Sequence, residues 1–276
     1  MRLRDLNASW IIKTHFFGIY MTDPDGTVFL PNPQNTSQRL ENSVIEQAIR
    51  EAVATLEGLL DVNIRHKERI VETHDFDKDM WEQYGMVNLR KYPVTKIHSL
   101  RIQYGENGPT IWEVPAQLIQ MGGEGSMFGM VRILPMWGVA SNYDPAYSML
   151  FPGVLRAHTA PSLIRVEYDA GMEGMTDPTT NTTIDLDDAV VRAIGLKASV
   201  HPFNVLGDIV LGAGSAGISA SVDGVSQSIS TTISAENAAY SARIIMHRRE
   251  LYGEMGQPGL IETLRKTWRR PSLILL

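Results

Sequence analysis

Residues 43–60 read SVIEQAIREAVATLEGLL and carry the clearest structural signal in this sequence. Apolar residues recur there every three or four positions, at Ile45, Ala48, Ile49, Ala52, Val53, Leu56 and Leu60. This period is typical of an α-helix with one buried face. Ser43 stands three residues before Glu46, which is the pattern of a capping box, so the helix is predicted to begin near Ser43.

Two further long helices are predicted in the C-terminal half of the chain. One begins at Asp185, with Asp188 in its first turn, and Pro202 is expected to end or kink it. The other is capped by Ser234 and runs to about Tyr252. Its buried face is expected to consist of Ala238, Ala242, Ile245 and Met246.

The middle of the chain changes to short β-like runs separated by turns. The runs are 64–76, 86–91, 94–104, 110–114, 130–134 and 163–168. Prolines, Pro161 among them, are expected at the ends of these runs, where a missing N–H donor does least harm. Residues 122–129 and 137–158 are expected to form loops.

The N-terminal segment is rich in aromatic residues, including Trp10, Phe16 and Phe17. It continues into the turn-rich sequence Asp23-Pro24-Asp25-Gly26, and we expect an extended arm with a hairpin. Together these elements predict an α+β fold, a small helical bundle with a β-rich insertion. The expected division is an arm at 1–40, a helical core at 41–62 and 172–258, the insertion at 63–171 and a docking segment at 259–276.

Residues 207–232 are poor in charge and rich in Gly, Ser and Ala. Apolar and polar residues alternate on either side of Asp223-Gly224, which is typical of a β-hairpin. The hypothesis is that this hairpin faces a channel or a neighbouring subunit through Ile218, Val222, Asp223, Gly224, Val225 and Ile229.

The composition excludes several classes of protein. The absence of cysteine removes disulfides, thiolate catalysis and thiolate metal sites. A net charge of -6 and a pI of about 5.7 argue against tight binding to a phosphate backbone. No apolar run is long enough to cross a membrane, and no secretory signal is expected.

Three patterns of chemical interest have weak support. The sequence from Gly212 to Gly217 matches G-x-G-x-x-G, but a strand and an Asp-Gly turn are expected after it where a dinucleotide site needs a helix. The spacing of Asp75, Asp77 and Asp79 lacks the glycine and glutamate of a calcium loop. His74 beside Asp75 is expected to be a surface residue rather than a catalytic base. No cofactor, metal or catalytic residue is therefore predicted.

Three segments carry a resemblance to a known family: VNLRKYPV at 87–94, IRVEYDAG at 164–171, and the stretch from Val222 to Arg243. Together with the helices at 43–60 and after Asp185, they resemble the head–tail connector, or adaptor, family of long-tailed bacteriophages. The resemblance covers about residues 41–255, and its motifs are structural rather than catalytic.

The resemblance implies a structural virion protein made in the cytoplasm of a bacterial host and located in the neck of the particle. Members of the family form a ring, usually of twelve copies, below the portal protein. The ring extends the DNA channel without binding DNA specifically, and it provides the attachment surface for neck or tail proteins. No membrane partner is expected.

The C-terminal segment is amphipathic and ends in an apolar stretch, which needs a protein partner to cover it. Docking on the portal is assigned to Leu260, Ile261, Leu264, Trp268, Arg269, Arg270, Leu273, Ile274, Leu275 and Leu276. Two alternatives stay open. The chain is another virion part, such as a tail-completion or baseplate subunit, or more remotely a nucleotide-binding enzyme that uses the loop from Gly212 to Gly217.

Overall fold

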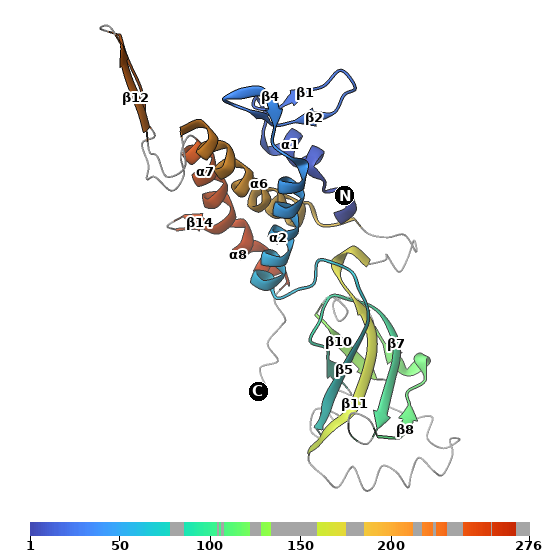
Figure 1. Cartoon of the computed structure of the whole chain (residues 1–276). Coiled ribbons are helices and arrows are strands. Elements are labelled where there is room, and N and C mark those ends of the chain that lie inside the picture. Colours follow the sequence, from blue (N-terminus) through green and yellow to red (C-terminus); the bar gives the residue numbers. More distant parts are fainter. Residues whose placement is uncertain are drawn as a thin grey trace. The chain divides into compact units, whose positions relative to one another are not determined.

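The chain divides into two compact units (Figure 1). The helical unit comprises Met1–Asp61 and Asp185–Thr267, and the β unit comprises Val62–Ile184 and Trp268–Leu276. The presence of helices and antiparallel sheets confirms the predicted α+β class. The computed structural model describes residues 1–77, 86–103, 105, 108–121, 128–133, 159–174, 185–211, 217–222, 225–230, 240–254 and 256–268.

Helix α2 (Asn42–Leu60) buries the apolar stripe that its sequence predicts. The predicted capping box is wrong, because Glu41 is the N-cap and the hydroxyl of Ser43 donates to the Glu41 carboxylate at 2.9 Å. At the other end, Asp61 is left-handed with φ 56°, and the guanidinium of Arg265 donates to the carbonyl of Leu59 at 2.8 Å. This bond satisfies one of the carbonyls that every helix end leaves without an intrahelical partner.

Helix α6 (Asp188–Leu211) contacts α1, α2 and α7 and is the central element of the helical unit. It begins later than predicted, since the Asp187 carboxylate accepts the N–H of Ala189 at 2.9 Å. Pro202 was expected to end or kink the helix, and it does not end it, because it lies inside α6. Apolar residues on several sides of α6 are buried, and this packing outweighs the one backbone hydrogen bond that proline removes.

Helix α1 (Ala8–His15) corrects the expectation of an extended arm. The side chain of Asn7 accepts the N–H of Trp10 at 2.9 Å, and Ile11 and Ile12 are fully buried. Their spacing from Ala8 is that of a helix face, which the aromatic and β-branched content of the segment obscures. The expected hairpin follows α1. Its strands are β1 (Met21–Thr22) with β2 (Val28–Phe29), and a second pair is β3 (Pro31–Asn32) with β4 (Asn35–Arg39).

Helix α7 (Ser241–Tyr252) is turned differently from the prediction. Ser241, Ile244 and Leu251 are buried, whereas Met246 is 66% exposed and Ala242 is exposed. Apolar residues occur on both sides of this helix, so its own sequence did not select the face that packs on α6. The predicted cap Ser234 and Ala238 lie outside the described residues. Strands β14 (Gly253–Glu254) and β15 (Gln257–Pro258) then lead into α8 (Leu260–Trp268).

The described residues of the β unit form two antiparallel sheets. The larger has the order β5-β11-β7-β8, and the smaller has the order β6-β10-β9. The strands are β5 (Lys67–Asp77), β6 (Met86–Asn88), β7 (Val94–Gln103), β8 (Thr110–Glu113), β9 (Ile119–Gln120), β10 (Met130–Ile133) and β11 (Thr159–Ala170). Short 3-10 turns lie at Leu3–Asp5, Ala116–Leu118 and Met172–Gly174.

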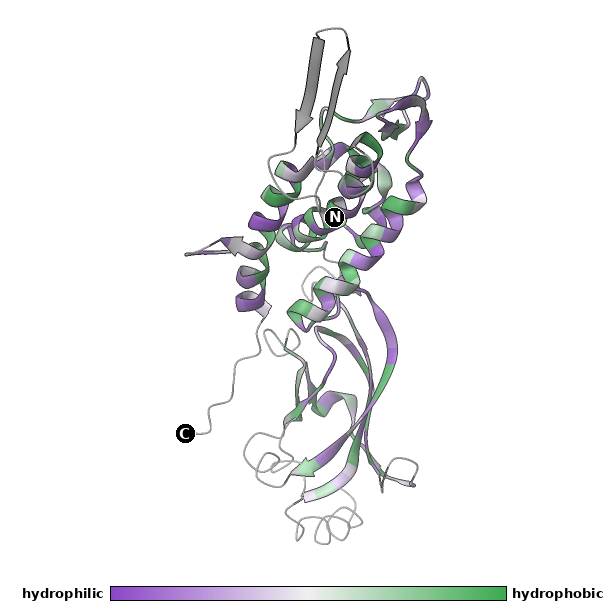
Figure 2. Ribbon diagram, turned by 60° about the vertical axis from the view of Figure 1, so that its left-hand side comes forward, coloured by the Kyte–Doolittle hydropathy of each residue, from purple (hydrophilic) through white to green (hydrophobic). Residues whose placement is uncertain are grey.

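One hydrophobic core joins the two sheets, since buried residues of both belong to a single cluster. Leu100, Val166 and Tyr168 of the larger sheet lie in it with Val87 and Val131 of the smaller. Hydrophobic and hydrophilic residues alternate along the long strands (Figure 2), as expected for strands with one buried face.

Most of the predicted β runs coincide with strands, and two differences are informative. The two-residue strand β9 was not predicted, because so short a run has no period. Pro161 lies inside β11 rather than at its end, at a register shift between Ala160 and Ile164. Ser162 there has φ 51° and its N–H donates to Asp75 at 2.8 Å, so the irregularity accommodates the proline.

The hairpin predicted around Asp223-Gly224 is present as β12 (Gly217–Val222) and β13 (Val225–Ser230). Ile218 pairs with Ile229 and Val222 with Val225, while Asp223 and Gly224 lie outside the described residues. Residues 212–216 lie outside them as well, but Gly217 begins a strand. A strand at this point differs from the helix that a dinucleotide-binding loop precedes.

Candidate assembly surfaces

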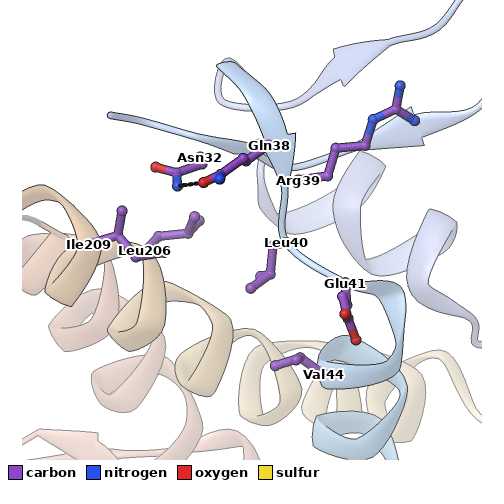
Figure 3. Close-up of a pocket in the computed structure, with 8 residues that line it drawn as sticks. All are labelled: Asn32, Gln38, Arg39, Leu40, Glu41, Val44, Leu206 and Ile209. Atoms are coloured by element: carbon purple, nitrogen blue, oxygen red, sulfur yellow. Dashed lines mark hydrogen bonds between the residues drawn. The ribbon is translucent and has the colours of Figure 1, made fainter. Parts of the chain in front are cut away.

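A pocket of about 360 Å³ lies in the helical unit (Figure 3). Leu40 lies in the segment before α2, and Val44 lies in the first turn of α2. Both face Leu206 and Ile209 of α6. Asn32, Gln38, Arg39 and Glu41 complete the lining. The volume is at the small end of the usual range for ligand pockets, roughly 300–1,000 Å³, so it suits one or two side chains of a partner.

The rim of this pocket is held by contacts within the N-terminal hairpins. The amide of Asn32 donates to the side-chain oxygen of Gln38 at 3.0 Å. Arg39 points away from the pocket in Figure 3, and its guanidinium donates to both carboxylate oxygens of Asp23, at 2.5 and 2.8 Å. The same guanidinium lies 4.2 Å from the ring centre of Phe29. Arg39 therefore organises the rim and is already paired.

A second feature of the helical unit is an exposed apolar surface. The side chain of Phe17 is 76% exposed and that of Met246 is 66% exposed. Arg243 of α7 donates to the backbone carbonyl of Phe17 at 3.2 Å, and Met246 lies one helical turn beyond Arg243. We call Phe17 and Met246 the Phe17 surface. Arg243 thus links the turn that carries Phe17 to the helix that carries Met246, and large exposed apolar side chains often mark an interaction site.

The interior of the helical unit contains a pair of histidines. The rings of His15 and His247 lie 5.7 Å apart, and Phe203 stacks on Phe16 at 4.1 Å beside them. Burial, followed by the charges of His247 and Arg192, lowers the pKa of His15 from 6.5 to about 4. Burial also lowers the pKa of His247. Both imidazoles are thus neutral at pH 7 and serve as packing groups.

The β unit instead contains a buried carboxylate with several donors. The hydroxyl of Tyr168 donates to Glu72 and accepts the N–H of Lys91 at 3.1 Å. The other oxygen of Glu72 accepts the N–H of Arg90 at 2.9 Å and the imidazole of His74 at 3.1 Å. Burial alone raises the pKa of Glu72, but the three hydrogen bonds outweigh it and lower the pKa to about 2.

A smaller cluster of the same kind surrounds Asp169. This carboxylate accepts the N–H of Arg69 and the imidazole of His98, both at 2.8 Å. Burial raises the pKa of Asp169, and these two hydrogen bonds lower it below its usual value in spite of that. His74, predicted to be a surface residue beside Asp75, is largely buried against Glu72. The expectation of an exposed His74 is wrong because the strand places Glu72 and His74 on one face.

Within the described ranges, no three His, Asp or Glu side chains are grouped so as to hold a metal ion. No helix in that same part of the chain has the length and apolar character needed to span a membrane.

The residues assigned to portal docking fall into two groups. Ile261, Leu264 and Trp268 are buried, and Leu260 is partly buried. Arg269, Arg270, Leu273, Ile274, Leu275 and Leu276 lie outside the described residues. The pocket and the Phe17 surface were not predicted, because each is made by segments that are distant in sequence.

Comparisons with known proteins add little. No family model matches the chain, and no curated protein matches it significantly. Among solved structures, the chain is similar to one in the neck of an empty GTA particle computed with C6 symmetry. The identity is 16%, the TM-score is 0.33, and the match covers 58% of this chain and 66% of that one, just under two thirds. So low a TM-score gives the likeness no weight for fold or function.

Proposed function

We propose that this chain is a structural neck protein of a tailed phage or phage-like particle, and specifically a head–tail adaptor that forms a ring below the portal. The observation that carries the proposal is the division of the chain. Two segments distant in sequence form one helical unit, and the larger part of the β unit, Val62–Ile184, lies between them in the sequence. This arrangement is the one that the resemblance to the adaptor family implies.

The ionisable clusters support a structural role. Both oxygens of Glu72 accept hydrogen bonds from the protein, and Asp169 accepts two more. Carboxylates whose oxygens are engaged in this way stabilise strands and turns, and those oxygens are not available to bind a substrate. The hairpin of β12 and β13 also fits an assembly role, since an isolated two-stranded hairpin is marginally stable in water and gains from a neighbour.

Portal docking is proposed for the residues that follow α8. Ile261 and Leu264 are buried within the chain, so they anchor the segment and are not free to dock. The sequence from Arg269 to Leu276 combines two cations with a run of apolar residues and supplies the contact.

The test is native mass spectrometry of the full chain, alone and mixed with its portal. A ring-sized mass, or one that forms only with the portal, is expected. A monomer whose mass does not change when the portal is added contradicts the proposal. Deleting 269–276 while keeping Trp268 is expected to leave a folded ring that cannot join portal-bearing heads, and completion of particles by this variant contradicts the docking assignment alone.

A further inference from the structure

The helical unit carries both a pocket and an exposed apolar surface, and they are separate. The lining of the pocket does not include Phe17 or Met246. Phe17 is 76% exposed, so its ring does not occupy the pocket of its own chain. A molecule with a projecting aromatic residue and an apolar hollow elsewhere can associate head to tail with copies of itself.

We propose that the Phe17 surface of one copy inserts into the pocket of the next copy, and that this contact closes the ring. This inference rests on the proposed adaptor function and deepens it, since it assigns the subunit interface. The apolar side chains Leu40, Val44, Leu206 and Ile209 receive the ring of Phe17.

The position of Phe17 is fixed by its backbone. It follows the last turn of α1, and Gly18 next to it has φ 81°, which favours glycine. The N–H of Ile19 donates to the carbonyl of Phe16 at 3.0 Å, and Arg243 holds the carbonyl of Phe17. A bulky side chain presented on an ordered turn loses little conformational freedom on binding, which favours its use as an anchor.

The charges around the two sites are complementary. The lining contains one cation, Arg39, which is paired with Asp23, and one carboxylate, Glu41, which supplies the remaining charge at the pocket. The guanidinium of Arg243 contacts the carbonyl of Phe17, so a cation lies beside the Phe17 surface. Opposite charges around an apolar contact set its orientation and disfavour wrong partners. The charges thus favour a second copy of this chain as the occupant.

The absence of cysteine from the chain allows a clean test by cross-linking. Full-length protein carrying Phe17→Cys and Ile209→Cys is oxidised and separated on a non-reducing gel. A ladder of disulfide-linked multimers that disappears on reduction is expected. The control carries Glu51→Cys with Ile209→Cys, because Glu51 is exposed on α2 and is not part of either site. It is expected to give no ladder.

Three results overturn the inference. A disulfide within one chain, an equal ladder in the control, or rings without a cross-link each exclude this contact, and the last leaves the adaptor function intact. If the chain stays monomeric in native mass spectrometry, both alone and with the portal, the proposed adaptor function is wrong. The experiments therefore distinguish a wrong interface from a wrong function.

A second variant measures the strength of the contact. Phe17→Ala is expected to raise the protein concentration needed for ring assembly at least about tenfold, as for an anchor residue, with an unchanged melting temperature. Val71→Ala removes an exposed apolar residue of the β unit and is expected to leave assembly unchanged. Assembly of Phe17→Ala at the normal concentration contradicts the inference.

Discussion

The helical unit and the β unit both bury ionisable side chains, but they do so in opposite charge states. In the helical unit, His15 and His247 lie among aromatic rings, and burial keeps both imidazoles neutral. In the β unit, Glu72 and Asp169 are ionised because backbone and side-chain donors surround them. The interior of a helix uses its own N–H groups in intrahelical hydrogen bonds, whereas in the β unit the N–H groups of Arg69 and Arg90 donate to these carboxylates.

The difference predicts that acid acts on the two units in separate pH ranges. The folded-state pKa of His15 is below its usual value, so its contribution to stability is complete above pH 6.5 and is lost as the pH falls toward about 4. The folded-state pKa of Glu72 is also below its usual value, but that contribution is complete above pH 4.5 and is lost toward about pH 2. The helical unit should therefore lose stability before the β unit as the pH is lowered.

The largest effect is expected from Glu72→Ala. The substitution leaves the hydroxyl of Tyr168 and the N–H of Arg90 without their acceptor, and it should lower the free energy of unfolding of the β unit by about 3 kcal/mol. Calorimetry measures the change. Glu68→Ala is the control, because Glu68 is exposed on the same strand and should change stability by less than about 0.5 kcal/mol. If the two substitutions lowered the free energy of unfolding equally, the hydrogen bonds of Glu72 would not stabilise the β unit.

A smaller effect is expected from His15→Gln, which replaces a titrating ring by a neutral side chain. The wild-type helical unit should lose roughly 2 kcal/mol between pH 6.5 and pH 4, and the variant should lose less, because only His247, whose pKa burial also lowers, still titrates there. Hydrogen exchange followed by mass spectrometry on peptides of α6 and β11 reports the two units separately. His201→Gln, at an exposed position of α6, is the matched control for the substitution itself. An unaltered slope in His15→Gln contradicts the assignment.

The smallest effect is expected from Arg39→Ala at the rim of the pocket. This guanidinium is half exposed, so loss of its pair with Asp23 and its contact with Phe29 should cost about 1 kcal/mol. The expected loss shrinks at high salt, because salt screens exposed ion pairs. Thermal melts at low and high salt check this. A loss that is independent of salt would show that Arg39 acts through packing alone.

The sequence predicted those helices and strands whose hydrophobic pattern lies within a single continuous segment. The stripe of α2 and the alternation in β7 identify each element because burial on one face imposes a period on the residues themselves. The hairpin around Asp223-Gly224 followed from a local turn preference in the same way. The resemblance to the adaptor family also came from linear motifs, and the proposed function rests on it together with the division of the chain into two units.

What the sequence could not supply depends on contacts between distant segments. Which side of α7 is buried, and why α6 continues through Pro202, were decided by the packing of α6 against its neighbours. The pocket brings Leu40 and Val44 to Leu206 and Ile209, and the Glu72 cluster brings Tyr168 to a residue 96 positions earlier. Periodicity and motifs describe one segment at a time, so a site made by two segments appears only when tertiary structure places them together.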